Sequence, residues 1–267
     1  MAERYAVIGN PVAHSKSPWI HAEFARATGQ DIDYGRIEAP LDAFARAVDE
    51  FRAAGARGAN VTVPFKEKAF AYCGDSITER ARVAAAVNTL VFEGERVSGD
   101  NTDGVGLLTD LTRNLGRSLA AKRVLLMGAG GAAQGVLGPL LAAQPARLVI
   151  ANRTAERARA LARRFAGAIG GGYEDLGQEQ FDLLINATSA GLADEAPAVE
   201  ARLFAPGALA YDMVYGRETP FLAAARAAGA QACDGTGMLV EQAAESFLVW
   251  RGVRPDTAPV LAALRRR

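Results

Sequence analysis

A glycine-rich turn in the middle of the chain constrains the fold more than any other feature. The turn has the sequence GAGGAA, residues 128–133, and directly follows the apolar run 124–127. A strand that ends in Gly-x-Gly-x-x-Ala and leads into a helix presents backbone N–H groups and a helix N-terminus to a pyrophosphate. The pattern therefore predicts a dinucleotide site. An ordinary glycine-rich bend between a strand and a helix is the alternative.

The position of this turn predicts two domains. About half of the 267 residues are hydrophobic, which is enough for two modest cores. The turn stands near the centre of the chain, so another domain precedes it. We expect an α/β fold of two α/β domains, residues 1–103 and a second domain from 104, with the second a doubly wound, Rossmann-type parallel sheet.

Charge and cysteine content exclude several classes of function. The formal net charge is zero and the sequence pI is about 6.8, so nothing favours a nucleic acid or a membrane surface as partner. No stretch approaches the roughly 20 apolar residues of a membrane span. Cys73 and Cys233 lie far apart and have neither metal-ligand nor redox spacing. We expect free thiols, no metal and a cytoplasmic protein.

Strand and helix patterns alternate through both domains. Ser17 is a candidate N-cap for the first helix. In the first domain we expect strands at 5–8, 34–38, 58–64 and 89–92 and helices at 18–28, 41–54 and 77–84. After a seam at 99–104 we expect strands at 124–127, 148–150, 181–185 and 208–213, and helices at 105–115, from the glycine turn to 143, 155–165, 219–228, 238–250 and 257–265.

The strand after the glycine turn indicates which dinucleotide binds. In an NAD site that strand ends in Asp or Glu, which holds the ribose 2′-hydroxyl. Here it runs into Asn152, Arg153 and Thr154, with no carboxylate. A planar cation and a hydroxyl suit the 2′-phosphate of NADP. The alternative is a solvated arginine and a threonine that only caps the next helix.

A second loop is expected at the cofactor edge. Residues 186–191, NATSAG, follow the next predicted strand, so they should face the cofactor at the carboxyl edge of the sheet. A polar loop with a turn glycine is the alternative.

Three polar clusters lie at strand ends or helix starts of the first domain. Residues 14–18 offer hydroxyls and free N–H groups at a helix N-terminus, which suit a carboxylate, although a plain N-cap explains them too. In 60–66, alternation places Asn60 and Thr62 on one side and Val61 and Val63 on the packed side. The third cluster is 88–89 with 100–103.

Lys66 and Asp103 are the candidate proton-transfer pair. A lone Lys and a lone Asp more often form a surface ion pair worth little. Both lie at turns beside candidate ligand groups, however, and a nicotinamide enzyme acting on an alcohol or ketone needs a proton donor and acceptor beside the hydride path.

Nine motifs in this order resemble those of the shikimate dehydrogenase family. They span nearly the whole chain, which makes the set far more specific than any single motif. The motifs are GNPVAHSKSP at 9–18, ANVTVPFK at 59–66, AVNT at 86–89, GDNTDG at 99–104, GAGGAA at 128–133, NRT at 152–154, NATSAG at 186–191, YDMVY at 211–215 and GMLVEQAAESF at 237–247.

This resemblance implies reversible, NADPH-dependent reduction of 3-dehydroshikimate to shikimate in aromatic amino-acid biosynthesis. It implies that Lys66 and Asp103 are catalytic. The implied substrate-binding residues are Ser15, Ser17, Thr62, Asn88, Asp103, Tyr215 and Gln242. The implied cofactor-binding residues are Gly128, Ala129, Gly130, Gly131, Ala132, Asn152, Arg153, Thr154, Met213 and Gly237.

The resemblance also has consequences for the domains. The C-terminal helices, 238–267, are expected to fold back onto the first domain, which leaves 104–237 as the NADP-binding domain. The substrate cleft is expected between the two domains. An exposed strand edge in the first domain would allow a homodimer.

Two rival functions stay open at this point. One is a quinate/shikimate dehydrogenase of broader scope, because quinate shares the carboxylate and ring hydroxyls of shikimate. The other is a regulator that binds NADP or shikimate without catalysis. Lys66, Asp103 and Gln242 together argue against the regulator, because a sensor needs no proton-transfer pair.

Overall fold

The computed structural model describes residues 2–188 and 199–266. The chain divides into two compact units, Met1–Gly106 with Leu239–Arg267 and Leu107–Met238. Two helices, α5 (Asp103–Thr109) and α9 (Thr236–Arg251), contribute residues to both units. None of the helices in the described residues is long and apolar enough to cross a membrane.

The first unit is built on a five-stranded sheet. Its strand order is β2-β1-β3-β4-β5, in which β1, β2 and β3 are parallel and β4 is antiparallel to both neighbours. The strands are β1 (Glu3–Gly9), β2 (Ile32–Glu38), β3 (Gly58–Val61), β4 (Thr89–Glu93) and β5 (Arg96–Asp100). Its other helices are α1 (Ser17–Thr28), α2 (Phe44–Ala53), α3 (Lys66–Cys73), α4 (Glu79–Ala84) and α10 (Ala258–Arg265).

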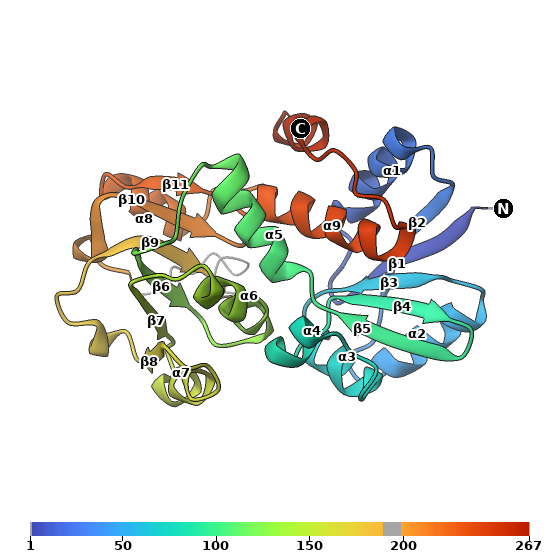
Figure 1. Cartoon of the computed structure of the whole chain (residues 1–267), viewed down its shortest axis with the longest axis horizontal. Helices are drawn as coiled ribbons and strands as arrows, with labels where there is room; N and C mark the ends of the chain where they lie inside the picture. Colours follow the sequence, from blue (N-terminus) through green and yellow to red (C-terminus); the bar gives the residue numbers. More distant parts are fainter. Residues whose placement is uncertain (1, 189–198, 267) are drawn as a thin grey trace. The chain divides into compact units, whose positions relative to one another are not determined.

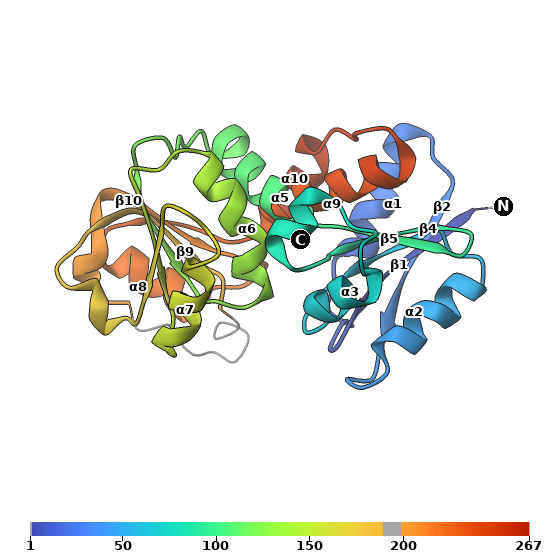
Figure 2. The same ribbon diagram turned by 60° about the horizontal axis from the view of Figure 1, so that its bottom comes forward.

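Helices cover both faces of this sheet. Apolar side chains of α2 and α3 pack on one face together with Ile8, Ala59 and Val61. On the other side lie α1, α9 and α10 (Figures 1 and 2). Phe24 of α1 and Phe247 of α9 share a core with apolar residues of α10. The C-terminal helices therefore complete the core of the first unit, which places Gln242 and Ser246 of α9 in the same unit as Lys66 and Asp103.

The second unit is a doubly wound parallel sheet. Its order is β11-β10-β9-β6-β7-β8, and every pair is parallel. The strands are β6 (Arg123–Met127), β7 (Arg147–Ala151), β8 (Ala168–Gly171), β9 (Phe181–Asn186), β10 (Phe204–Asp212) and β11 (Gln231–Cys233). The helices are η1, a π-helix (Asp110–Asn114), α6 (Gly131–Ala142), α7 (Ala155–Ala162), the 3-10 helices η2 (Glu174–Leu176) and η4 (Ala201–Leu203), and α8 (Pro220–Ala227).

The order of these strands locates the ligand edge. The chain runs outward from β6 through β7 to β8, then returns to place β9 on the other side of β6. In open α/β sheets, ligands bind outside the carboxyl ends of the strands at such a reversal. The residues that follow β6, β7 and β9 are therefore the ones positioned for a dinucleotide, and the glycine turn comes directly after β6.

Alternation along β6 explains its two buried faces. Val124 and Leu126 pack on the side of α6 and α7, whereas Leu125 and Met127 pack on the side of α8. A strand covered by helices on both faces needs apolar residues at every position. The apolar run before the glycine turn meets that requirement.

Several details differ from the sequence-based expectations. Strands β5, β8 and β11 and helix α3 were not predicted. The expectation that Ser17 caps the first helix is wrong, because α1 begins at Ser17 and Lys16 holds the cap position without a side-chain bond. The packed role expected for Val63 is also wrong: β3 ends at Val61, and Val63 is 49% exposed.

One buried histidine stabilises the first unit only in its neutral form. His21 of α1 is fully buried, and its ring stacks on Tyr34 with centroids 4.2 Å apart. Burial lowers the pKa of His21 from 6.5 to about 3, against a smaller opposing effect of the Asn60 side chain. Neither ring nitrogen has a hydrogen bond of good geometry within the described residues. A proton would therefore place a poorly compensated charge in an aromatic core.

This histidine should make folding sensitive to mild acid. The folded pKa is the lower one, so the stabilisation is complete above pH 6.5 and is lost as the pH falls toward 3. Between pH 7 and pH 5 we expect His21 alone to lower the free energy of unfolding by about 2 kcal/mol. Urea unfolding at both pH values measures this quantity. The free energy of unfolding of His21→Phe should fall by about 2 kcal/mol less than that of wild type between pH 7 and pH 5. His14→Asn, at an exposed site, is the control and should behave as wild type.

Candidate active site

Lys66 and Asp103 form a close ion pair in the first unit. Lys66 is the first residue of α3, and Asp103 is the first residue of α5. The Lys66 Nζ donates a hydrogen bond to Asp103 Oδ2 at 2.6 Å. The lysine side chain is 16% exposed and the aspartate side chain 5%. Such burial distinguishes the pair from the surface ion pair that the sequence left open. The ammonium keeps contact with solvent while the carboxylate is fixed.

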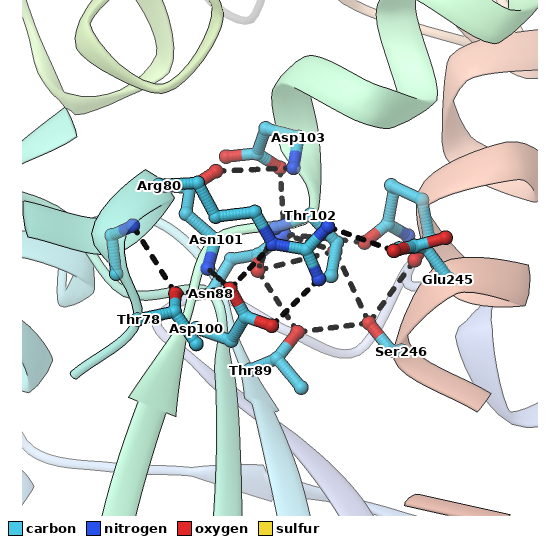
Figure 3. Close-up of polar contacts among 12 residues, drawn as sticks. Thr78, Arg80, Asn88, Thr89, Asp100, Asn101, Thr102, Asp103, Glu245 and Ser246 are labelled. Atoms are coloured by element: carbon cyan, nitrogen blue, oxygen red, sulfur yellow. Dashed lines mark hydrogen bonds and ion pairs between the residues drawn. The ribbon is translucent and has the colours of Figure 1, made fainter. Parts of the chain in front are cut away.

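Asn88 orients the carboxylate from the other side. Its Nδ2 donates to Asp103 Oδ1 at 2.9 Å, so one carboxylate oxygen faces Lys66 and the other faces Asn88. Asn88 is itself fixed, because its Oδ1 accepts from the Thr102 backbone N–H at 2.8 Å. The Asp103 N–H donates to Asn101 Oδ1 at 3.1 Å (Figure 3). These bonds hold the carboxylate in one rotamer.

Gln242 reaches the same group of residues from α9. Asn88 Nδ2 lies 3.4 Å from Gln242 Oε1, and Gln242 Nε2 donates to the Leu239 carbonyl. The approach of α9 to α5 depends on a glycine: a Cβ at Gly106 would lie 2.7 Å from Gln242 Cβ and 2.8 Å from its backbone N. Gly106 therefore lets α9 bring Gln242 to the site.

The Gly106→Ala variant tests this close approach. The added methyl group meets helix backbone, which cannot rotate away, so α9 must shift. We expect a loss of about 1–3 kcal/mol in the free energy of unfolding. Gln242 would also be displaced, and we expect KM for the substrate to rise several-fold more than kcat falls. Steady-state kinetics measure KM and kcat, and urea unfolding measures the free energy of unfolding. An unchanged KM would contradict a role for Gly106 in placing Gln242.

Ser15 and Ser17 lie together at the start of α1. Both are buried, each 6% exposed, and the Ser17 N–H donates to Ser15 Oγ at 3.3 Å. Thr62 follows β3, is half-buried, and its hydroxyl has no hydrogen-bond partner in the described part of the chain. These hydroxyls and the Lys66–Asp103–Asn88–Gln242 group all belong to the first unit. Tyr215, the remaining residue of the predicted substrate set, belongs to the second unit.

A partly buried ionic network that was not predicted supports the loop before Asp103. Arg80 of α4 donates to both oxygens of Asp100 at 2.6 Å. Its third nitrogen donates to Glu245 of α9 at 2.7 Å (Figure 3). Asp100 accepts from the Asn101 N–H, next to the turn that ends in Asp103. Arg254 bonds Glu245 as well. Arg80 thus joins the loop that carries Asp103 to the helix that carries Gln242.

The protonation state of this network follows from its hydrogen bonds. Burial by itself would raise the pKa of Asp100, but the bonds from Arg80 and Thr78 and the charge of Arg80 lower it below its ordinary value. The carboxylate is therefore ionised at neutral pH. No motif indicated this pairing, because Arg80 and Glu245 are 165 positions apart.

The glycine turn has the geometry that a pyrophosphate requires. Gly128 has φ +106°, and a Cβ there would lie 3.1 Å from the Ala187 backbone, so only glycine fits. Gly130 occupies the N-cap of α6, makes no side-chain bond, and has open space where a Cβ would be. The first N–H groups of α6 are thus left without a side-chain cap. The sequence motif at 128–132 fits a phosphate group.

The end of β7 fits a 2′-phosphate. Arg153 is exposed and has neither an ion-pair nor a hydrogen-bond partner within the described residues. Thr154 holds the N-cap of α7, yet its hydroxyl forms no cap bond, so the simple capping alternative is not realised. Asn152 Nδ2 donates to the Thr154 carbonyl and fixes this turn. Arg157 is a further cation at this end of the sheet, and the sequence did not point to it. Its side chain is exposed in the first turn of α7 and has no partner within the described residues.

Two other predicted cofactor residues lie near the same sheet edge. The Met213 N–H donates to the carbonyl of Asn186, the last residue of β9. Asn186 Oδ1 accepts from the Thr188 hydroxyl at 2.7 Å. Residues 189–191 of the predicted loop lie outside the described residues. Gly237 packs against the Asp110 carboxylate so closely that no side chain would fit.

Family models match three segments of the chain. Residues 7–90 match the shikimate dehydrogenase substrate binding domain. Residues 110–196 match the shikimate/quinate 5-dehydrogenase family. Residues 235–265 match the shikimate 5′-dehydrogenase C-terminal domain.

Known proteins resemble the chain over almost its full length. The NADP(+) shikimate dehydrogenase of Aromatoleum aromaticum is 60% identical, covering 99% of this chain and 98% of the relative. The solved Ael1 enzyme of Pseudomonas putida is 48% identical with a TM-score of 0.91, covering 98% of both chains. The shikimate 5-dehydrogenase of Thermus thermophilus, solved in complex with NADP(H) and shikimate, is 37% identical with a TM-score of 0.88, covering 99% of both chains.

Proposed function

This chain belongs to the shikimate dehydrogenase family, and we propose that Lys66 and Asp103 are the catalytic pair with which it interconverts 3-dehydroshikimate and shikimate. The enzyme is an NADP-dependent oxidoreductase of the shikimate pathway. The observation that supports the pair is the 2.6 Å hydrogen bond from the partly exposed Lys66 ammonium to the buried Asp103 carboxylate. The second oxygen of that carboxylate accepts a hydrogen bond from Asn88. Such a pair can hold a proton at a defined point and pass it to a ligand oxygen.

Lys66 acts as the proton donor in the reducing direction. Its ammonium donates to the oxygen of the 3-keto group, where negative charge develops as the carbonyl is reduced. Asp103 holds the ammonium through Oδ2, and Asn88 prevents the carboxylate from turning away. In the reverse direction neutral Lys66 accepts the proton of the 3-hydroxyl. Orientation of these groups before the reaction lowers the barrier, because no side chain has to reorganise.

The second unit fits NADP(H). When bound, the cofactor supplies or accepts the hydride. The glycine turn would hold the pyrophosphate at the N-terminus of α6, while Arg153, Thr154 and Arg157 would hold the 2′-phosphate. Gly128 to Ala132, Asn152, Met213 and Gly237 complete the proposed set. The three residues directly after β7 include no acidic side chain that would favour NAD.

The first unit provides groups that match the substrate. Ser15 and Ser17 would donate to the carboxylate, and Thr62, Asn88, Asp103 and Gln242 would bond the ring hydroxyls. Each is a buried or half-buried hydrogen-bonding group of one unit. Tyr215, from the second unit, would also contact the substrate. We propose that the first unit holds the substrate and the second the cofactor.

One absorbance assay at the nicotinamide band tests this function. The purified chain is given shikimate or quinate with NADP or NAD in all four combinations. We expect turnover chiefly with shikimate and NADP. Comparable rates with quinate would favour the broader quinate/shikimate dehydrogenase. No turnover in any of the four combinations would favour a non-catalytic binding protein.

Two further properties are proposed from the chain itself. Cys73 and Cys233 are both free thiols, which supports a reducing, cytoplasmic location. Strand β2 is an edge strand of the first sheet and could pair with a second copy to form a homodimer. Light scattering of the purified chain would give its mass and test the dimer.

A further inference from the structure

Two residues of β2 support the loop that holds Ser15 and Ser17. Tyr34 and Arg36 are two positions apart on the strand, so their side chains point to the same face. The Arg36 guanidinium donates two hydrogen bonds to the Ser15 carbonyl, from Nη2 at 2.6 Å and from Nε at 3.2 Å. The bonds fix the loop and place a positive charge beside it.

Tyr34 links the second serine to the same cluster. Its hydroxyl donates to Asn60 Oδ1 at 2.7 Å, and the Ser17 side chain is near enough to lower the pKa of Tyr34. Burial raises the pKa of Tyr34 well above 10.0, against the opposing effects of the Ser17 side chain and the Arg36 charge. The phenol is therefore neutral and cannot neutralise Arg36. Ser15, Ser17, Tyr34 and Arg36 form one group, which we name the serine cradle.

The charge of Arg36 is not neutralised by any residue that the structure describes. Within the described residues Arg36 has no carboxylate partner, whereas Arg80 and Arg254 each bond two carboxyl groups. Both hydrogen bonds that its guanidinium donates in the described part of the chain go to a backbone carbonyl. A guanidinium that is anchored without an acidic partner attracts an anion that binds next to it. The carbonyl that it holds belongs to Ser15, whose buried hydroxyl accepts from the Ser17 N–H.

We propose that Arg36 is a specificity-determining residue that makes the serine cradle select a carboxylate over a neutral group. The serines supply hydrogen bonds that an ester or an amide could also accept. The charge of Arg36 supplies the preference for the anion. This inference rests on the proposed function, because it takes the cradle as the carboxylate site of shikimate.

Paired substrates separate this electrostatic role from a structural one. The values of kcat/KM are measured for shikimate and for shikimate methyl ester, which lacks the negative charge. Wild type should have a higher kcat/KM with shikimate than with the methyl ester. In Arg36→Met we expect kcat/KM for shikimate to fall about tenfold while that for the ester changes less than about threefold. Arg36→Lys keeps the charge and should retain most of the preference.

A control and two distinct failures complete the experiment. Arg46→Met removes an exposed arginine of α2 in the same unit, 3.9 Å from Glu50, and should leave both substrates unaffected. An equal loss with acid and ester in Arg36→Met would mean that Arg36 only shapes the loop, and no loss would mean that it plays no part. Either result overturns the inference while wild type still oxidises shikimate. Wild type that fails to use shikimate would instead overturn the proposed function.

Discussion

A Lys66→Met enzyme is expected to bind substrate and cofactor normally and to lose between about 10² and 10⁴ in kcat. Methionine has a similar length and keeps the apolar contacts of the lysine stem, but it can neither donate nor accept a proton. The loss should fall on kcat, because the proton moves only as the carbonyl or alcohol reacts. KM should change by less than about threefold if the ammonium contributes little to ground-state binding.

Stopped-flow and steady-state kinetics measure this loss, with calorimetry to confirm that shikimate and NADP still bind. Lys68→Met is a matched control, because Lys68 lies on the same helix, is exposed, and donates to the Leu41 carbonyl. It should keep full activity. Near-normal turnover in Lys66→Met, with both ligands bound, would remove Lys66 from the mechanism and leave water or another group as proton donor.

The prediction that Lys66 and Asp103 act as a pair came from motifs that lie close to each residue in the chain. Both stand at the first position of a helix, directly after a strand or a short turn, and such junctions are visible locally. Their 2.6 Å contact joins residues 37 positions apart, however, and became visible only in the structure. The turn positions of the two residues made them candidates, the resemblance to a family implied that they are catalytic, and hydrophobic periodicity predicted only the strands and helices around them.

The missed residues depend on contacts between distant parts of the chain. Arg80 and Arg36 look like ordinary surface arginines in a chain that has 30 lysines and arginines. Only the fold shows that one bonds Asp100 and Glu245 and that the other bonds the Ser15 carbonyl. For Arg36, the one local signal was its place two residues after Tyr34 on a predicted strand.

The missed strands have weak hydrophobic patterns. Strand β5 has the sequence RVSGD and pairs with β4 through a two-residue turn that contains Gly94 at φ +64°. A glycine in a two-residue turn is a hairpin signal, and it could have indicated this strand. Strand β8 is AIGG, and its Gly170 lets α7 pack against the strand backbone. Tertiary packing decides such a segment, because its own residues barely favour a strand.

The cofactor preference should depend strongly on one residue. In Arg153→Asp we expect kcat/KM for NADP to fall by on the order of 10² to 10³. A charge-assisted pair of bonds is lost, and the new carboxylate repels the 2′-phosphate. With NAD the same carboxylate can accept a hydrogen bond from the ribose 2′-hydroxyl, so activity should be unchanged or should rise. The ratio of the two kcat/KM values is the measured quantity.

Arg147→Asp is the control for this change. Arg147 begins β7, at the opposite end of the strand that Arg153 follows, and it bonds Glu179 at 2.8 Å. The two variants change the net charge of the enzyme equally, so any general electrostatic effect on a highly charged cofactor appears in both. Only Arg153→Asp should alter the NADP/NAD ratio. Equal losses for NADP and NAD in Arg153→Asp would show that the arginine supports the loop without contacting the 2′-phosphate. The cation that selects NADP would then have to be sought elsewhere, with Arg157 as the next variant to make.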